Sequence, residues 1–249
     1  MKPVVFIGAG PGAADLITLR GAQRLAAADV VLFDALTDPA LQDLAPRARW
    51  INVGKRGFRD STGQVAINNL LVRHAQAGKA VVRLKGGDPS VFGRLEEELG
   101  ALAAAGIEAE VVPGVTAAIA AAAATQRPLT RRGSGRSVSL STAMTRSGEL
   151  RATRTADTEV FYMAGRQLAA LGRRLRQAGW PDDTPVLVVS RAGWPDQLAS
   201  DHRANSLAEA ALLHAGRPTV VTVGVGAAPV GAVTAPQREV LRTRARQVA

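Results

Sequence analysis

Short runs of apolar residues alternate with longer, Ala-rich stretches along most of this chain. Short apolar runs bounded by turn residues are typical of buried strands, and apolar residues at helical spacing indicate helices. The pattern predicts strands at 3–7, 29–33, 80–84, 109–112, 137–142, 158–163, 185–190 and 218–224. It predicts helices at 16–28, 64–77, 93–105, 115–124, 166–178 and 205–214. Such alternation favours an α/β fold with mostly parallel strands in mixed sheets.

A break in the pattern falls at Pro113-Gly114, after an apolar run and before a new helical stretch. Proline and glycine together commonly mark a turn or linker. We therefore predict an N-terminal α/β domain at 1–112 and a C-terminal α/β domain at 113–234. The remainder, 235–249, is rich in arginine and is interpreted as a basic tail.

Composition narrows the possible chemistry. The 249 residues include no cysteine and three histidines, none of them in a close pair, so we expect no disulfide, no thiol nucleophile and no metal site. The net charge of +10 suits a polyanionic partner. Arginines are spread along the whole chain and only 4% of residues are aromatic, which argues against nucleic acid as that partner.

The N-terminal apolar run is too short for a signal peptide or a membrane span. We therefore expect a cytoplasmic protein that does not interact with membranes.

A glycine-rich turn, Gly8-Ala9-Gly10-Pro11-Gly12, follows the first predicted strand. With Ala13 it fits a loose dinucleotide fingerprint, and Asp34 stands where an acid that binds ribose belongs. Pro11 opposes that interpretation because it removes a backbone N–H that a phosphate would need. An NAD-binding oxidoreductase and a plain tight turn both stay open as alternatives.

Two further loops combine glycines with charged residues. Gly54-Lys55-Arg56-Gly57 presents two cations that suit a carboxylate or phosphate, unless it is simply a solvated turn. Gly86-Gly87-Asp88-Pro89 ends a predicted strand at the sheet edge where open α/β folds bind ligands. The Asp88 carboxylate suits ribose hydroxyls or an amino group, although an ordinary Asp-Pro turn explains the same residues.

A fourth motif, Pro113-Gly114-Val115-Thr116-Ala117-Ala118, opens a predicted helix. The free N–H groups of Thr116 and Ala117 await an acceptor there, unless Thr116 acts only as a helix cap.

The order and spacing of these motifs resemble the tetrapyrrole methyltransferase family over roughly residues 3–226. The resemblance rests on GAGPGAADLITLRG at 8–21, ADVVLFDAL at 28–36, VGKRG at 53–57, QVAINNLL at 64–71, RLKGGDPSVFGR at 83–94, VVPGVTAA at 111–118, PLTRRG at 128–133 and FYMAG at 161–165.

The resemblance implies a two-domain homodimer with its active site in the cleft between the domains. It implies C-methylation of uroporphyrinogen III to precorrin-2 by way of precorrin-1. S-adenosylmethionine would be the methyl donor and S-adenosylhomocysteine the by-product. The sequence departs from the family pattern at Thr142-Ala143-Met144 and Ala164. These departures leave open a methyltransferase for a later corrin precursor, or a relative that binds without catalysis.

The motif match also assigns residues. The predicted cofactor-binding residues are Pro11, Gly86, Gly87, Asp88, Val91, Thr116, Ala117, Met163 and Ala192. The predicted acid–base pair is Asp34 and Lys55. Arginine pairs well with the acetate and propionate groups of the substrate. The predicted substrate-binding residues are Arg20, Arg56, Arg94 and Arg131, with Lys55, Arg83 and Arg132 as further candidates.

Overall fold

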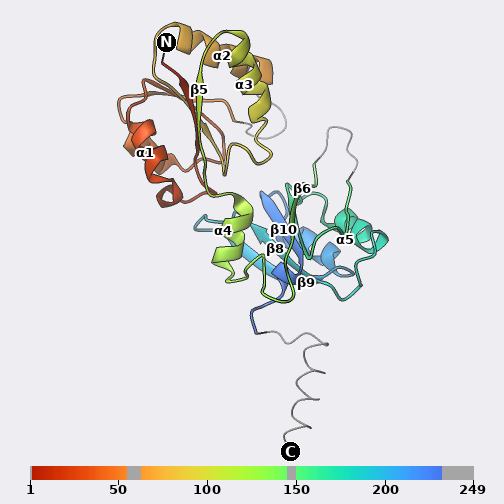
Figure 1. Cartoon of the computed structure of the whole chain (residues 1–249). Helices are drawn as coiled ribbons and strands as arrows, with labels where there is room; N and C mark the ends of the chain where they lie inside the picture. The colour runs from red at the N-terminus through yellow and green to blue at the C-terminus, as the bar shows by residue number, and fades with distance from the viewer. Residues whose placement is uncertain (1, 55–62, 145–149, 232–249) are drawn as a thin grey trace, which may run out of the picture.

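A computed structural model describes residues 2–54, 63–144 and 150–231 of the chain. It contains two five-stranded sheets, one formed by the N-terminal half and one by the C-terminal half (Figure 1). The chain passes from the first half to the second between the last strand of one sheet and the helix that follows it. The domain bounds 1–112 and 113–234 stay a prediction, and the basic tail lies outside the described residues.

The N-terminal half is a purely parallel sheet with helices on both faces. Its strands run in the order β3-β2-β4-β1-β5, and every pair in it is parallel. Its elements are β1 (Val4–Gly8), η1 (Ala14–Leu16), α1 (Leu19–Ala26), β2 (Val30–Phe33), η2 (Pro39–Leu44), β3 (Arg49–Asn52), α2 (Gln64–Gln76), β4 (Val81–Lys85), α3 (Leu95–Ala104) and β5 (Ala109–Val112).

Alternation of side chains along the strands builds two core layers in this half. Phe6 and Leu32 pack with Leu71 of α2, whereas Ile7 and Leu84 pack with Leu25 of α1. Helix α1 therefore covers one face, and α2 and α3 cover the other (Figure 1). Since β1, β2 and β4 are parallel neighbours, the loops that leave them emerge at one edge of the sheet.

The C-terminal half is a mixed sheet with strand order β6-β7-β10-β8-β9. Strands β6 and β7 pair in parallel, and the other three pairs are antiparallel. Helix α4 packs on one face and α5 on the other. The elements are α4 (Ala117–Ala124), β6 (Val138–Thr142), β7 (Thr158–Tyr162), α5 (Leu168–Gln177), β8 (Pro185–Ser190), β9 (Leu198–Arg203), η3 (Leu207–Glu209), α6 (Ala210–Leu213), β10 (Thr219–Gly224) and η4 (Val225–Ala227).

The predicted α/β class is confirmed, with differences at particular elements. Strands β3 and β9 were not predicted because both are edge strands with polar residues inside them. The helix expected at 16–28 begins later, because the Thr18 side chain accepts the Gly21 N–H and caps α1 there. The helix expected at 205–214 is a 3-10 turn followed by the short helix α6.

Candidate active site

Three turns rich in glycine meet where the two halves of the chain join. The Gly10 N–H donates to the Gly87 carbonyl at 3.3 Å, and the Gly87 N–H donates back to Gly10 at 2.7 Å. A Cβ added at Gly8 would lie 2.5 Å from the Gly114 Cα, so no other residue fits without a backbone shift. Close packing of the two backbones thus explains why glycine is found at Gly8 and at Gly114, which lies between β5 and α4.

The first glycine turn is filled by protein from the C-terminal half. A Cβ on Gly12 would overlap the indole of Trp194, and a Cβ on Gly193 would lie 3.0 Å from the Pro11 Cγ. Pro11 therefore lies against the loop that leaves β8, beside Ala192. A pyrophosphate would have to displace the indole from Gly12, so this packing opposes the dinucleotide alternative.

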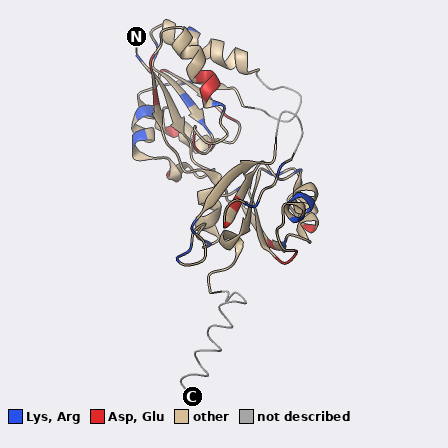
Figure 2. Cartoon of the chain, turned by 45° about the vertical axis from the view of Figure 1, so that its right-hand side comes forward, with Lys and Arg blue, Asp and Glu red and all other residues tan. Residues whose placement is uncertain are grey.

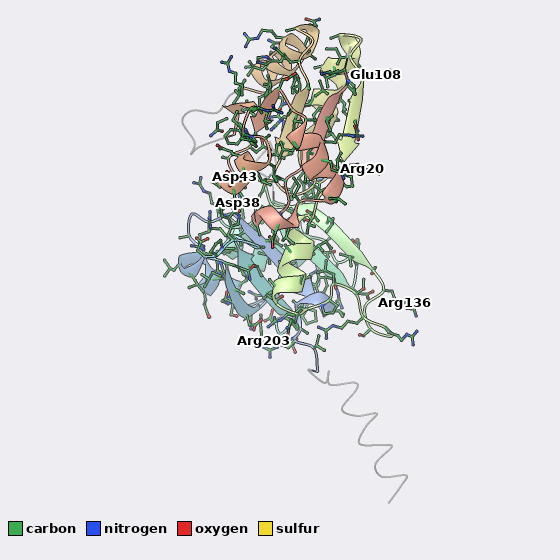
Figure 3. The ribbon with its side chains drawn as sticks, turned by 90° about the vertical axis from the view of Figure 1, so that its left-hand side faces the viewer. Arg20, Asp38, Asp43, Glu108, Arg136 and Arg203 are labelled. Carbon is green, nitrogen blue, oxygen red and sulfur yellow. The ribbon has the colours of Figure 1, made fainter. Side chains whose placement is uncertain are left out.

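A hollow of about 630 Å³ opens beside this turn, between the two halves. Figure 3 shows Asp38, one of its lining residues, at the level where the halves meet. The residues that line the hollow are Ala13, Ala14, Asp15, Asp38, Gly193, Trp194, Pro195 and Gln197.

The Asp88 side chain links the loop after β4 to the segment between β5 and α4. Asp88 accepts the Gly114 N–H at 2.9 Å through Oδ2 and the Ser90 N–H at 2.8 Å through Oδ1. Ionised carboxylates form strong hydrogen bonds to backbone N–H groups and have capacity for further donors. Asp88 is half-buried at the joint between the halves, with its loop fixed in place.

The two glycines before Asp88 differ from Gly8 in their surroundings. A Cβ added at Gly86 would find its nearest neighbour, the Leu36 Cβ, at 3.5 Å, and one at Gly87 would find Thr116 at 3.8 Å. The φ angle of Gly87 is +70°, which favours glycine. A side-chain carbon would therefore fit at Gly86 in ordinary contact with Leu36, so close packing of backbones does not require glycine there.

The C-terminal half contributes the opposite wall. The Thr116 side chain does not cap α4, because its hydroxyl lies 2.8 Å from the Tyr162 hydroxyl. Burial raises the pKa of Tyr162, which keeps its phenol neutral. Met163 follows β7 with φ +56° and is exposed. The start of α4 and the end of β7 thus face the same joint as the Asp88 loop.

Apolar contacts bring several of the predicted cofactor residues together. Val91, from the loop after Asp88, packs on the same cluster as Ala117 of α4 and the buried Ala192 after β8. The Phe92 ring lies 5.0 Å from the Tyr162 ring, which joins this loop to β7. These residues from both halves therefore meet in one place.

Asp34 directly follows β2, which pairs with the strand that precedes the Asp88 loop. Its N–H donates to the Leu84 carbonyl at 3.2 Å, and its Oδ1 lies 2.6 Å from Arg83 Nη2. Its side chain is 31% exposed, so the carboxylate is accessible to solvent. Gly54 packs against Ala35. The Lys55 and Arg56 that follow it in sequence lie outside the described residues.

A family model described as Tetrapyrrole (Corrin/Porphyrin) Methylases matches residues 3–211. The chain belongs to the tetrapyrrole methylase family. It is 40% identical over 230 residues to the uroporphyrinogen-III C-methyltransferase of Pseudomonas aeruginosa, covering 89% of this chain and 92% of that protein. The matched residues include both the Asp88 loop and the start of α4.

Two further relatives extend this assignment. The siroheme synthase of a Psychrobacter species is 41% identical over 228 residues, and the chain spans less than half of its length, 47%. The solved uroporphyrin-III C-methyltransferase of Thermus thermophilus complexed with S-adenosylhomocysteine superposes with a TM-score of 0.79 at 35% identity. The superposition covers 90% of this chain and 98% of that one.

The arginines of this tetrapyrrole methylase differ in what they contact. Arg94 follows the Asp88 loop and forms a forked pair with Glu97, with both distances 2.7 Å. Arg131 donates to the carbonyls of residues 228 and 229, the latter at 3.2 Å. Arg20 is exposed on α1 (Figure 3). Of the four predicted substrate residues, Arg94 alone among those described lies in the loop of the candidate site.

Much of the positive charge lies elsewhere on the molecule. Figure 2 marks Lys and Arg positions in blue along α5, where Arg173, Arg174 and Arg176 are exposed. Among the described residues, exposed positive charge is therefore also found away from the candidate site.

Sequence reasoning missed a buried cluster of charges beneath Asp34. Arg83, Lys85 and Glu98 lie almost entirely inside the N-terminal half. The signal was available, since two cations alternate within an otherwise apolar strand. Arg83, considered above as a partner for substrate carboxylates, is instead buried against Glu98 and Asp34.

The described residues include neither a membrane-spanning helix nor a cluster that could hold a metal ion. No helix among the described residues is long and apolar enough to span a membrane. Within the same residues, no three His, Cys, Asp or Glu side chains gather as a metal ion would require.

Proposed function

We propose that this tetrapyrrole methylase transfers methyl groups from S-adenosylmethionine to ring carbons of uroporphyrinogen III. The product would be precorrin-2, formed by way of precorrin-1. One observation supports the proposal above all: the Asp88 loop, the start of α4, the end of β7 and the residues after β8 meet at the joint between the halves, and Asp34 follows the strand that pairs with β4. The named activities of the Pseudomonas and Thermus relatives support the choice of substrate.

S-adenosylmethionine would lie across the joint between the halves. Gly86 and Gly87 have no side chain between a ligand and their backbone, and Asp88 retains capacity to accept hydrogen bonds from it. In this proposal the ligand also meets Pro11, Val91, Thr116, Ala117, Met163 and Ala192. The bound cofactor supplies an electrophilic methyl group on sulfur.

Asp34 would act on the substrate rather than on the cofactor. A pyrrole carbon is electron-rich, so a carbon–methyl bond can form while the sulfur–methyl bond breaks. Alignment of the two groups then dominates the rate. The Asp34 carboxylate would stabilise the positive charge that develops on the ring and accept a proton that the macrocycle, rather than the methylated carbon, releases as that charge is lost. We assign Lys55, which follows Gly54 in the sequence, to the same acid–base work.

Arginines would hold the acetate and propionate groups of the substrate. Arg94 supports this proposal best because it is exposed and follows the Asp88 loop directly. To bind a substrate carboxylate it would exchange its partner Glu97. Arg56, which follows Lys55 in the sequence, is a further candidate. Arg20 and Arg131 stay predictions, and Arg131 would first have to release two backbone carbonyls.

We also propose that the protein works as a homodimer. Strand β6 is an edge strand, and it presents the exposed side chains Val138 and Leu140. An unpaired apolar edge is a common surface for pairing with a second copy. Light scattering coupled to size exclusion would give twice the chain mass if this is right, and the mass of a single chain if it is wrong. The cytoplasmic location stays a prediction.

The activity is tested by incubating purified protein with S-adenosylmethionine and uroporphyrinogen III and following product mass under anaerobic conditions. Successive gains of one and then two methyl groups are expected. A parallel reaction contains a later corrin precursor, precorrin-3. Turnover of that precursor alone would favour the later-pathway alternative. S-adenosylhomocysteine binding without methylation of either substrate would contradict the proposal.

A further inference from the structure

Four charged side chains form a continuous chain from the interior of the N-terminal half to the candidate site. Lys85 Nζ lies 2.6 Å from Glu98 Oε2, and Glu98 Oε1 lies 2.8 Å from Arg83 Nε. Arg83 Nη2 then lies 2.6 Å from Asp34 Oδ1. The side chains of Glu98 and Arg83 are 0% and 3% exposed, whereas that of Asp34 is 31% exposed. The chain of charges therefore opens to solvent at Asp34.

The charges in this chain balance, with two cations and two carboxylates. Burial disfavours the protonated form of Arg83, but the charges of Asp34 and Glu98 outweigh it and raise the pKa of the guanidinium. Burial and the neighbouring Arg83 lower the pKa of Lys85 against the pull of Glu98. Buried ion pairs often stabilise a fold no better than apolar residues of similar size. Stability alone is thus a weak reason for four such groups.

The Arg83 guanidinium is fixed in orientation by acceptors around it. Its Nε donates to Glu98, and its Nη1 donates to the carbonyls of Leu32 at 3.4 Å and Leu84 at 3.1 Å. Only Nη2 points to Asp34. Because these three contacts fix the plane of the guanidinium, its Nη2 group donates to Asp34 in one defined direction. The ammonium group of a flexible lysine would not be oriented in this way.

We propose that Arg83 is a positioning residue that aims the Asp34 carboxylate at the substrate, and that Glu98 and Lys85 hold Arg83 in place. This inference rests on the proposed acid–base role of Asp34. It also explains why an arginine with so little exposure lies next to the site. Its donors already have partners inside the protein, so Arg83 serves the reaction through Asp34 rather than through the substrate.

The test is a double-mutant cycle on the full-length protein. Arg83→Lys keeps the charge but cannot contact Glu98, Asp34 and two carbonyls together. Asp34→Asn removes the carboxylate, and the double variant combines both changes. Arg24→Lys is the matched control, because it makes the same change in an exposed pair with Glu110. Each protein is assayed for kcat and KM with uroporphyrinogen III, and for S-adenosylhomocysteine affinity by calorimetry.

We expect Arg83→Lys to lower kcat on the order of 100-fold in the wild-type background, as a misplaced catalytic group does. In the Asp34→Asn background the same change should lower kcat by less than about 2-fold, because the two residues act as one unit. Cofactor affinity should stay within about 3-fold throughout, since Arg83 has no contact with the cofactor loop glycines in this assignment. Arg24→Lys should match the wild type.

Three results would overturn the inference in distinguishable ways. Equal loss of kcat in both backgrounds would make Arg83 a purely structural residue. Unchanged kcat in Arg83→Lys would show that Asp34 needs no such support. Full activity of Asp34→Asn alone would remove the proposed role of Asp34, and the inference with it. If Arg83→Lys does not fold, as judged by lost cofactor binding, the charge-balanced pair Arg83→Gln with Glu98→Gln replaces it in the same cycle.

Discussion

Removal of the Asp88 carboxylate should weaken both the joint between the halves and cofactor binding. Asp88→Ala deletes two hydrogen bonds to backbone N–H groups, at 2.8 Å to Ser90 and 2.9 Å to Gly114. The Gly114 N–H is half-buried and would lose its partner, which costs about 1–3 kcal/mol. The exposed Ser90 N–H can turn to water at little cost. We therefore expect a loss of about 2 kcal/mol in the free energy of unfolding.

The same loss of stability in the Asp88 loop should also weaken cofactor binding. If the loop must be re-ordered before it can bind, about 2 kcal/mol corresponds to roughly 30-fold weaker affinity. Loss of direct contacts from the carboxylate would add to this figure. Asp88→Asn keeps one acceptor oxygen, so its affinity should fall between those of Asp88→Ala and the wild type.

The assay is calorimetric titration with S-adenosylhomocysteine, together with urea unfolding of each variant. Asp157→Ala is the control, because that carboxylate also accepts two backbone N–H groups, from Arg136 at 2.8 Å and Ser137 at 3.1 Å. Asp157 precedes β7, at the opposite end of that strand from Met163. It should lose stability but keep its cofactor affinity. Equal affinity of folded Asp88→Ala and Asp157→Ala would refute the reasoning.

Three other predictions concern stability. Gly8→Ala should destabilise by ~3 kcal/mol through overlap with Gly114, whereas Gly100→Ala, in open space on α3, should stabilise by up to about 1 kcal/mol; urea unfolding compares the pair. Tyr162→Phe removes the hydroxyl partner of Thr116 and should cost about 1 kcal/mol, with a several-fold loss of S-adenosylhomocysteine affinity in calorimetry. Burial, and after it the charges of His202 and Arg217, lower the pKa of His214 below the ordinary histidine value of 6.5. As the pH falls through 6.5, the imidazole therefore takes up its proton more readily in the unfolded chain than in the folded one. Stability should therefore fall as pH drops from 7.5 to 5.5 in urea titrations, and a slope that His214→Gln leaves unchanged would assign it to other groups.

The fold class followed from local patterns that the tertiary structure preserves. Strands such as β2 and β8 are buried along most of their length, so they appear in the sequence as nearly continuous apolar runs. Strand β9 could not be found this way. It lies at a sheet edge, where alternate residues are exposed and polar ones such as Asp201 and His202 are tolerated. Its place is set by pairing with β8, which only the folded chain reveals.

The candidate site was predictable as a set of loops but not as a set of contacts. Sequence order places Asp34 and Asp88 after strands, and parallel pairing then brings those loops to one edge. The fate of each arginine was not predictable, because Arg83, Arg94 and Arg131 have the same chemistry in the sequence. One is buried against carboxylates, one is exposed, and one donates to carbonyls. Burial, which depends on the whole fold, decides between these roles.

A crystal structure with S-adenosylhomocysteine bound tests the central claim most directly, because that claim concerns where the methyl donor lies. We predict the ligand between the two halves, in contact with Gly86, Gly87 and Asp88 on one side and with Thr116, Ala117 and Met163 on the other. Its sulfur should face Asp34. Density for the ligand on the Gly8–Gly12 turn, or in the hollow beside Trp194 with the Asp88 loop untouched, would contradict the account.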